Sequence, residues 1–499
     1  MTSTFFSFGQ NTNLGSFHHN EDIGNPAQKG GATYDSLSQT YALSSGGENI
    51  WGKRDEFNFV YDTIQGDFIL TANFKFDGKG KNPHRKVGIM LRESTDADAA
   101  HVSAVLNGKG LTSLQWRTEK GGLMNDMENE IKATETGYNI LQLERTGDTL
   151  IMRAAQFGKS LQVIGSYVPE FDSGFLGLFI SAHDSSAVEN AVAYNVRLNR
   201  PVPEDYNAGK RGDLGCRLET INIKTGKRTI IYESKNKFEA PNWMPDGKNL
   251  LINMQGSLFR IPISGGAFTQ LNTGDKHNLN NDHGISFNGK MIAFSHNRPN
   301  LPGYGSTVYV MPISGGEPKM ITPVTPSYFH GWAPDNETVA YVAIRKPSTT
   351  FNIYKKNIHS GKETALTNTK PDQHVDGCEY SPDGKYIYYN ASASGNMQLW
   401  RMRPDGSSKE QLTFDKNRNW FPHISPDGKW IAYISFPPSI DLNDHPAYKR
   451  VTLNLMPADG GKAEVIAYLY GGQGTINVPS WSPDSKHFAF VSNWGKKSH

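Results

Sequence analysis

The chain lacks the features that mark secreted disulfide scaffolds, membrane proteins and nucleic-acid binders. It has two cysteines in 499 residues, Cys216 and Cys378, which are too few for a disulfide framework and which we predict to be unpaired structural thiols. Its formal net charge of +2 gives no electrostatic argument for binding nucleic acid or an anionic membrane. No apolar run approaches the about 18 residues that a membrane-spanning helix needs.

Two other signals are missing. The first residues, MTSTFFSFGQNTN, have neither the basic segment nor the apolar core of a secretory leader. The compartment therefore stays open: cytoplasmic, or periplasmic or secreted if a leader was removed. There is no G-x-S-x-G nucleophile elbow and no helical α/β region to carry one, which excludes a prolyl-peptidase-type catalytic domain.

The sequence does contain a short phrase that recurs six times in the C-terminal half. Its fifth residue recurs at spacings of 42, 47, 48, 44 and 57 residues. A period of about 40–50 residues built from short strands predicts a β-propeller with one blade per repeat. The six copies are NWMPDG (242–247), GISFNG (284–289), GWAPDN (331–336), EYSPDG (379–384), HISPDG (423–428) and SWSPDS (480–485).

We predict that each repeat forms four strands. Pro-Asp-Gly is a tight-turn sequence, and apolar β-rich runs such as KYIYYNA follow it. The sixth copy has only its first two strands before the chain ends. The segment CRLETINIKTGKRTIIYE (216–233) has the strand–turn–strand form that would complete that last blade. We therefore predict an all-β fold with six blades, the last built from both ends of the domain.

These repeats, with Leu-Thr strand ends at Leu366-Thr367 and Leu412-Thr413, resemble the propeller of the TolB-like family. The resemblance covers about residues 214–494 and implies the fold. It leaves the function open, because propellers of this kind serve as partner-binding platforms, peptidase gates and polysaccharide-lyase bodies.

The first 200 residues lack the repeat and alternate apolar with polar residues in short runs, which predicts an antiparallel β-sandwich. GDFILTANF followed by KVGIMLRES resembles the concanavalin-like (jelly-roll) domain found beside many carbohydrate-active modules. The predicted domains are thus a concanavalin-like sandwich (1–200), a Pro-rich linker (201–213) and the propeller (214–499).

Candidate site residues lie just before the turns, where the innermost strand of each blade borders the central channel. Three histidines and an acid occupy this place in successive blades: His283, His330, Glu379 and His423. Imidazoles and a carboxylate that converge on a narrow opening would suit a divalent metal ion such as Mn²⁺, Ca²⁺ or Zn²⁺. The arrangement resembles the oligogalacturonate-lyase branch of propellers, which implies histidines and an amide holding a metal at the channel mouth.

This hypothesis has an alternative and a difficulty. The histidines could instead be hydrogen-bonded residues that fill the channel. Counted back from the turn, His283 and His330 also sit one position earlier than Glu379 and His423, and neighbouring positions of a regular strand face opposite sides. A local twist at the following glycines is one way to bring them inward.

Around this ring lie residues suited to sugar recognition, which uses planar polar side chains and aromatic faces. We predict that Asn281, Asp282, Trp420, Gln473 and Asn477 bind substrate. For catalysis we select His330, Asp376 and Glu379, because glycosidic cleavage commonly uses two carboxyl groups.

The sequence thus favours a protein that acts on an oligo- or polysaccharide. The predicted activity is that of a metal-assisted lyase or glycoside hydrolase, and an acidic glycan is one predicted substrate. The alternative is a non-catalytic TolB-like module that binds a glycan or a protein.

Overall fold

The computed structural model describes residues 14–125, 128–301 and 305–495. Within these ranges the regular secondary structure is β-strand except for a single short helix, α1 (Ala208–Arg211). No helix of the described residues is long and apolar enough to span a membrane. The chain divides into two compact units, Met1–Pro201 and Val202–His499.

The N-terminal unit contains two antiparallel sheets of seven strands each, and a two-stranded ribbon of β4 (Ile50–Trp51) and β5 (Arg54–Asp55). Across the first sheet the strands are β1 (His19–Ile23), β6 (Phe57–Gln65), β15 (Ser173–Ser181), β8 (Lys86–Arg92), β9 (His101–Asn107), β10 (Thr112–Arg117) and β11 (Glu130–Lys132). Across the second they are β14 (Gln162–Tyr167), β13 (Thr149–Ala155), β12 (Ile140–Thr146), β7 (Phe68–Phe76), β16 (Glu189–Asn199), β3 (Thr40–Gly46) and β2 (Gln28–Asp35).

The two sheets share one hydrophobic core. Ile89 and Leu91 of β8 belong to the same buried cluster as Leu141 and Leu143 of β12. The two residues named on each strand are two positions apart, and side chains two positions apart in a strand point to the same face, here the shared core. The unit is therefore a β-rich domain that buries apolar surface between its sheets.

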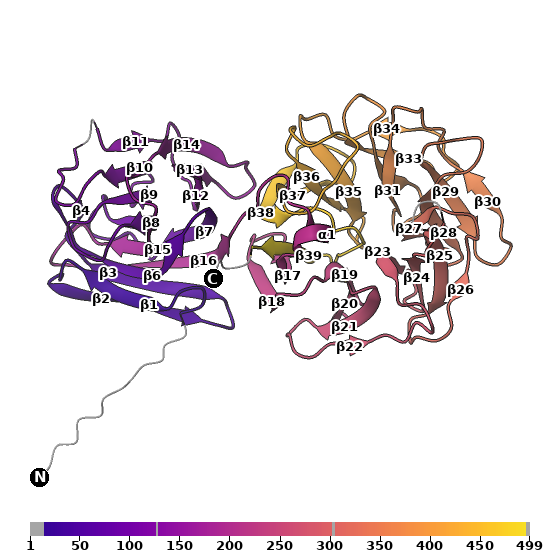
Figure 1. Ribbon diagram of the computed structural model, residues 1–499, viewed down its shortest axis with the longest axis horizontal. Coiled ribbons are helices and arrows are strands. Elements are labelled where there is room, and N and C mark those ends of the chain that lie inside the picture. The colour runs from indigo at the N-terminus through magenta and orange to yellow at the C-terminus, as the bar shows by residue number, and fades with distance from the viewer. Residues whose placement is uncertain (1–13, 126–127, 302–304, 496–499) are drawn as a thin grey trace, which may run out of the picture. The chain divides into compact units, whose positions relative to one another are not determined.

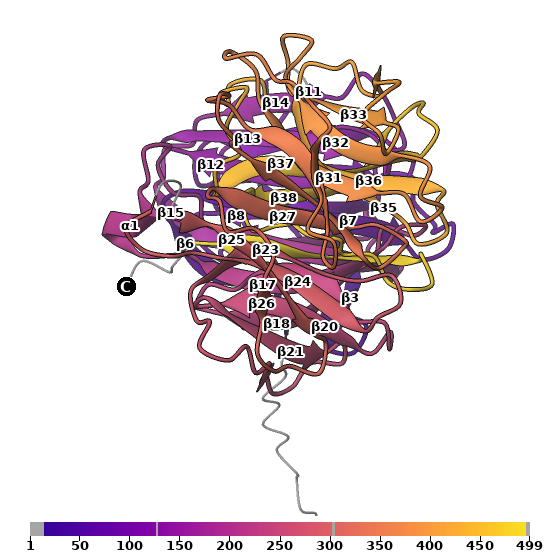
Figure 2. The same cartoon turned by 90° about the vertical axis from the view of Figure 1, so that its right-hand side faces the viewer.

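The C-terminal unit is a six-bladed β-propeller, as the repeats predicted. Figure 2 shows strands of three successive blades one below another, with β31 above β27 and β27 above β24. The first five blades are four-stranded sheets, and the strands of each follow in order from the innermost outward.

Blade one contains β19 (Glu239–Trp243), β20 (Asn249–Met254), β21 (Ser257–Pro262) and β22 (Thr269–Gln270). Blade two contains β23 (Leu279–Ile285), β24 (Met291–His296), β25 (Thr307–Pro312) and β26 (Lys319–Met320). Blade three contains β27 (Ser327–Trp332), β28 (Thr338–Ala343), β29 (Asn352–Asn357) and β30 (Glu363–Ala365). Blade four contains β31 (Val375–Tyr380), β32 (Ile387–Ala391), β33 (Gln398–Met402) and β34 (Glu410–Gln411). Blade five contains β35 (Arg418–Ile424), β36 (Trp430–Phe436), β37 (Lys449–Pro457) and β38 (Glu464–Gly471).

The sixth blade joins the two ends of the unit. Strand β39 (His487–Trp494) pairs with β17 (Gly215–Asn222), which pairs in turn with β18 (Arg228–Ser234). The innermost strand is reduced to a single bridge between Trp481 and Phe488. Figure 1 shows β39 beside β17. The predicted closure by residues 216–233 is thus confirmed.

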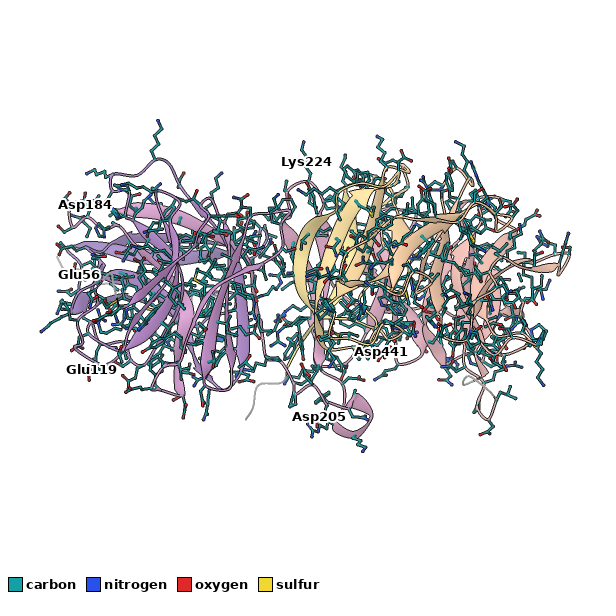
Figure 3. All side chains as sticks on the ribbon, turned by 90° about the horizontal axis from the view of Figure 1, so that it is seen from above. Glu56, Glu119, Asp184, Asp205, Lys224 and Asp441 are labelled. Atoms are coloured by element: carbon teal, nitrogen blue, oxygen red, sulfur yellow. The ribbon has the colours of Figure 1, made fainter. Side chains whose placement is uncertain are left out.

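The repeated turns form as their residues require. The Asp246 carboxylate accepts hydrogen bonds from the backbone N–H groups of Lys248 (2.8 Å) and Asn249 (3.0 Å), and Gly247 adopts a φ of 66°. These turns and other outer loops carry charged side chains on the surface, such as Lys224 and Asp441 in Figure 3. Cys216 and Cys378 are buried free thiols inside blades, as predicted.

Tryptophans of the repeat phrase connect neighbouring blades. The indole N–H of Trp332 donates to the carbonyl of Gly284 in the preceding blade (3.0 Å), and that of Trp481 donates to the carbonyl of His423 (2.9 Å). Both bonds are buried, so they satisfy carbonyl groups that water does not reach.

We expect Trp332→Phe to lower the free energy of unfolding of the propeller by about 1 kcal/mol, because it leaves the buried Gly284 carbonyl without its donor. The matched control is Trp243→Phe, since the buried Trp243 Nε1 has no hydrogen-bond partner. Urea unfolding followed by circular dichroism compares the two variants. Equal losses would show that the inter-blade bond does not contribute.

Candidate functional site

The innermost strands of blades two to five are each interrupted by a β-bulge just before the turn. The register shifts between Leu279 and His283 in β23, Phe329 and Gly331 in β27, Asp376 and Glu379 in β31, and Trp420 and His423 in β35. A bulge reverses which side chains face the channel on its two sides. Residues before and after it therefore belong to different environments.

Glycine is needed at one of these bulges. Gly377 has a φ of 59°, and a Cβ there would lie 2.6 Å from the Asn390 side-chain oxygen. Its neighbour Asp376 is thereby directed toward the channel mouth, whereas Glu379 lies beyond the bulge.

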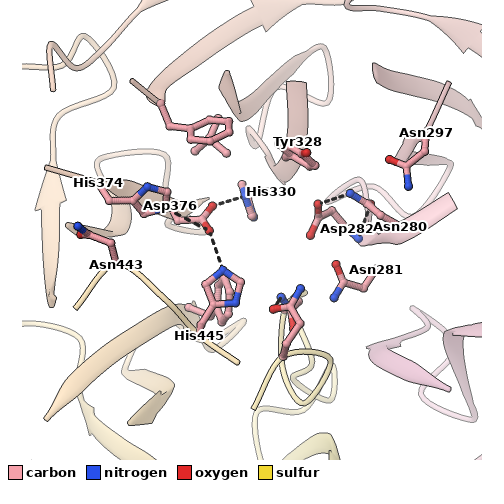
Figure 4. Close-up of a pocket in the computed structure, with 15 residues that line it drawn as sticks. Asn280, Asn281, Asp282, Asn297, Tyr328, His330, His374, Asp376, Asn443 and His445 are labelled. Atoms are coloured by element: carbon pink, nitrogen blue, oxygen red, sulfur yellow. Dashed lines mark hydrogen bonds and ion pairs between the residues drawn. The ribbon is translucent and has the colours of Figure 1, made fainter. Parts of the chain in front are cut away.

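A pocket of about 360 Å³ opens where the innermost strands begin. Figure 4 shows its polar side chains converging from several blades. It is lined by Asn280, Asn281, Asp282, Asn297, Tyr328, His330, Val342, Phe351, His374, Asp376, Phe421, Asn443, His445, Gln473 and Asn477.

An ion pair forms one wall of this pocket. His330 Nε2 lies 2.7 Å from Asp376 Oδ1, and both side chains are almost fully buried. Burial opposes ionisation of the carboxyl group, but the charge and hydrogen bond of His330 outweigh it and hold the pKa of Asp376 well below its usual range. Burial likewise disfavours the charged imidazole, yet Asp376 and then Asp282 raise the pKa of His330.

A second carboxyl group lies across the pocket from this pair, as Figure 4 shows. Burial raises the pKa of Asp282 to about 7, against the attraction of His330 and with the repulsion of Asp376. Its Oδ2 accepts a hydrogen bond from the Asn280 amide (2.8 Å). One carboxyl group is thus held ionised while the other binds a proton up to near-neutral pH.

The rest of the lining is amide-rich and aromatic. Asn477 Nδ2 donates to Gln473 Oε1 (2.9 Å), which fixes these two amides relative to each other. Tyr328, Phe351 and Phe421 add aromatic side chains to the lining.

The structure brings together most of the residues that the sequence nominated. Pocket-lining residues include the predicted catalytic His330 and Asp376, and the predicted substrate-binding Asn281, Asp282, Gln473 and Asn477.

The other predicted site residues lie outside this lining. Glu379 and His423 form a separate buried pair, with Oε2 of Glu379 2.7 Å from Nδ1 of His423. His283 is completely buried, and its Nδ1 contacts the Asn281 carbonyl. Trp420 is also completely buried, so its ring has no face open to a ligand.

The predicted metal site of His283, His330, His423 and Glu379 does not form. The described residues contain no group of three or more His, Cys, Asp or Glu side chains that could hold a metal ion. Both nitrogens of His423 are engaged, one by Glu379 and the other by the Ile476 carbonyl, so neither offers a lone pair to a metal. The one-position offset between His283 and His330 on one side and Glu379 and His423 on the other accounts for this difference, because neighbouring positions of a strand face opposite sides and the bulges do not bring all four side chains together.

Sequence reasoning missed five residues of the pocket lining: Asn297, Val342, Phe351, Asn443 and His445. Asn443 and His445 share one origin. They lie on the loop 437–448 between β36 and β37, outside the repeated phrase. The available signal was the length of this loop, together with its composition, DLNDHP. His374 stood in the inspected segment before β31 but was not selected.

Comparison with known proteins supports the fold and assigns the family. The family model for the TolB beta propeller domain matches residues 332–441. An uncharacterized protein of Agrobacterium fabrum is 42% identical over 287 residues, which are 57% of this chain and 94% of that protein. A solved structure of a protein from Agrobacterium tumefaciens, described provisionally as TolB, is also 42% identical, with a TM-score of 0.53 over 57% of this chain and all of that one. The chain belongs to the TolB-like β-propeller family.

The resemblance of this TolB-like chain to oligogalacturonate lyase is weaker. The structure of that lyase in complex with manganese is 13% identical and has a TM-score of 0.38, over 56% of this chain and 83% of the lyase. At this level the similarity carries no argument about substrate or metal.

We expect the chelated protein to take up much less than one Mn²⁺ or Zn²⁺ per chain when it is re-exposed to metal and dialysed, since the predicted ligands are split between layers. Elemental analysis of wild type and of His283→Ala measures this. Stoichiometric uptake that His283→Ala abolishes would restore the original ligand set.

Proposed function

We propose that this protein hydrolyses a glycosidic bond of a neutral glycan in the pocket at the channel mouth. The observation that carries the proposal is the pair of carboxyl groups, Asp282 and Asp376, whose pKa values are driven apart within one site. Two carboxyl groups in opposite protonation states are the usual machinery of glycoside hydrolysis.

The two roles follow from the two environments. Asp282 holds a proton up to a pH of about 7 and so serves as the general acid that protonates the leaving oxygen. Asp376 stays ionised beside His330, and its negative charge stabilises the positive charge that develops at the anomeric carbon. Buried charges act more strongly here than they would in water.

The lining favours a neutral sugar over an acidic one. Among the residues that the structure describes, no lysine or arginine lines the pocket. A lyase that abstracts the proton next to a uronate carboxylate must first neutralise that carboxylate with a cation. The pocket instead presents six amide side chains, which exchange hydrogen bonds with hydroxyl groups: Asn280, Asn281, Asn297, Asn443, Gln473 and Asn477.

We further propose that the N-terminal unit is a concanavalin-like β-sandwich that assists binding of the same polysaccharide. Its two seven-stranded sheets around a shared core support this assignment. The partner of the protein is then an oligo- or polysaccharide, and no step of the proposed reaction passes through a metal ion.

We expect Asp282→Asn and Asp376→Asn each to reduce turnover at least about 100-fold, because a positioned proton donor typically contributes about 10²–10⁴-fold and a positioned electrostatic group about 10²–10³-fold. The substrate is the neutral oligosaccharide, found in a panel, that the wild type cleaves most rapidly, and the assay detects new reducing ends. The matched control is Asp459→Asn, since that side chain is fully exposed.

Two results would contradict the proposal. Both variants could retain wild-type turnover, which would remove the carboxyl pair from the chemistry. The wild type could bind neutral oligosaccharides in calorimetry without cleaving any of them, which would favour the non-catalytic binding module instead.

The pH dependence of kcat/KM tests the acid directly. Burial raises the pKa of Asp282 to about 7, and the acid must be protonated to act, so activity should fall as pH rises through about 7. It should persist well below pH 5, because the lowered pKa of Asp376 keeps that group ionised. A profile that rises through pH 7 would assign the acid role elsewhere.

A further inference from the structure

The two oxygens of Asp376 have different surroundings. Oδ1 lies 2.7 Å from His330 Nε2 and accepts a hydrogen bond from the backbone N–H of Gly377 (2.9 Å). Oδ2 lies 4.0 Å from His374 Nε2 and 3.8 Å from His445 Nε2, and these are ion-pair distances beyond hydrogen-bond reach. The first oxygen is thus held by the protein, and the second is flanked by two imidazoles.

Aromatic neighbours fix both imidazole rings. The ring centroid of His445 lies 4.5 Å from that of Trp420 and 5.2 Å from that of Phe421, both in edge-to-face geometry. The ring centroid of His374 lies 5.7 Å from that of Phe351 and 5.8 Å from that of Trp420. Trp420 therefore contacts both imidazole rings, and this predicted substrate-binding residue instead supports the pocket lining.

The loop that carries His445 is anchored at both ends. Near its start, the Arg418 guanidinium donates to the carbonyls of Ile440 (3.2 Å) and Pro438 (3.1 Å). At its end, the Tyr448 hydroxyl donates to Asp213 (2.8 Å). His445 is thus held in place over the pocket even though its loop is long.

Resting on the hydrolase function proposed above, we propose that Asp376 Oδ2, His374 and His445 together bind the attacking water, so that hydrolysis proceeds by single displacement with inversion at the anomeric carbon. A bound water needs two to four polar partners. Each of the two Nε2 atoms lies close enough to Oδ2, at 3.8 and 4.0 Å, for a water to bridge that nitrogen and that oxygen.

The step balances in atoms and charge. The water oxygen forms the new bond to the anomeric carbon and passes a proton to Oδ2 of Asp376. The glycosidic C–O bond breaks with its electron pair, and the leaving oxygen takes the proton of Asp282. Asp282 ends ionised and Asp376 ends protonated, and exchange with solvent resets both. His374 and His445 orient the water and are positioning residues.

The geometry favours this route over covalent attack by Asp376. A carboxylate nucleophile gains nothing from two imidazole nitrogens beside its reactive oxygen. A water gains both its base and its orienting groups there, and orientation of the attacking atom contributes strongly to rate.

The deciding experiment is proton NMR of the cleavage reaction, on the neutral oligosaccharide that the wild type cleaves, recorded before the product anomers equilibrate. We expect the first product to carry the anomeric configuration opposite to that of the bond cleaved. Retention of configuration would overturn the water site and leave the hydrolase proposal intact. No cleavage of any glycan would instead overturn the hydrolase proposal itself.

Variants of His445 test the role of its imidazole independently of the product configuration. We expect His445→Ala to lower kcat at least 10-fold with little change in KM, and His445→Gln, which keeps a donor amide, to restore part of the loss. The control is His359→Ala, in a turn outside the pocket lining. A loss in His445→Ala that appears in KM alone, or that follows a lowered melting temperature, would remove His445 from the water site.

Discussion

The pairing of β39 with β17 is the constraint on which the rest of the propeller depends. It runs from Gly215 opposite Trp494 to Asn222 opposite His487, and so joins strands from the two ends of the unit. A four-stranded blade alone leaves its faces and edges exposed, and a closed ring covers them. Closure also fixes the relative positions of the innermost strands, and the pocket exists only where those strands converge.

The second constraint is the bulge in each of those strands. Because it changes the direction of side chains within a few residues, the channel is divided into layers. Asp376 and His330 meet in the pocket layer, while Glu379 and His423 meet in the other layer, only three residues from Asp376 along β31. The two layers are chemically distinct: the pocket lining offers reactive carboxyl groups and amides, whereas the Glu379–His423 pair is internally satisfied.

Burial gives the pocket its chemical character. Desolvation raises the pKa values of both carboxyl groups, and the position of His330 decides which pKa is nevertheless lowered. Asp376 forms an ion pair with the His330 imidazole, so its pKa falls. Asp282 is only attracted by that imidazole from farther away, so its pKa stays raised. One histidine can thus set two different protonation states, which is the asymmetry that acid–base cleavage requires.

The sequence by itself determined the propeller, its six blades and its mode of closure, because the turn phrase repeats at a spacing that fits one four-stranded blade and the last copy lacks strands that residues 216–233 can supply. It also predicted a site at the channel mouth, and six of the residues that it named line one pocket there: His330, Asp376, Asn281, Asp282, Gln473 and Asn477. It could not place Glu379, His423, His283 and Trp420, because strand parity fails at a bulge whose position no local pattern reveals. Only the tertiary structure decided that His445 reaches Asp376, since the two residues lie in different blades, and only ring closure and the anchoring of loop 437–448 bring them together.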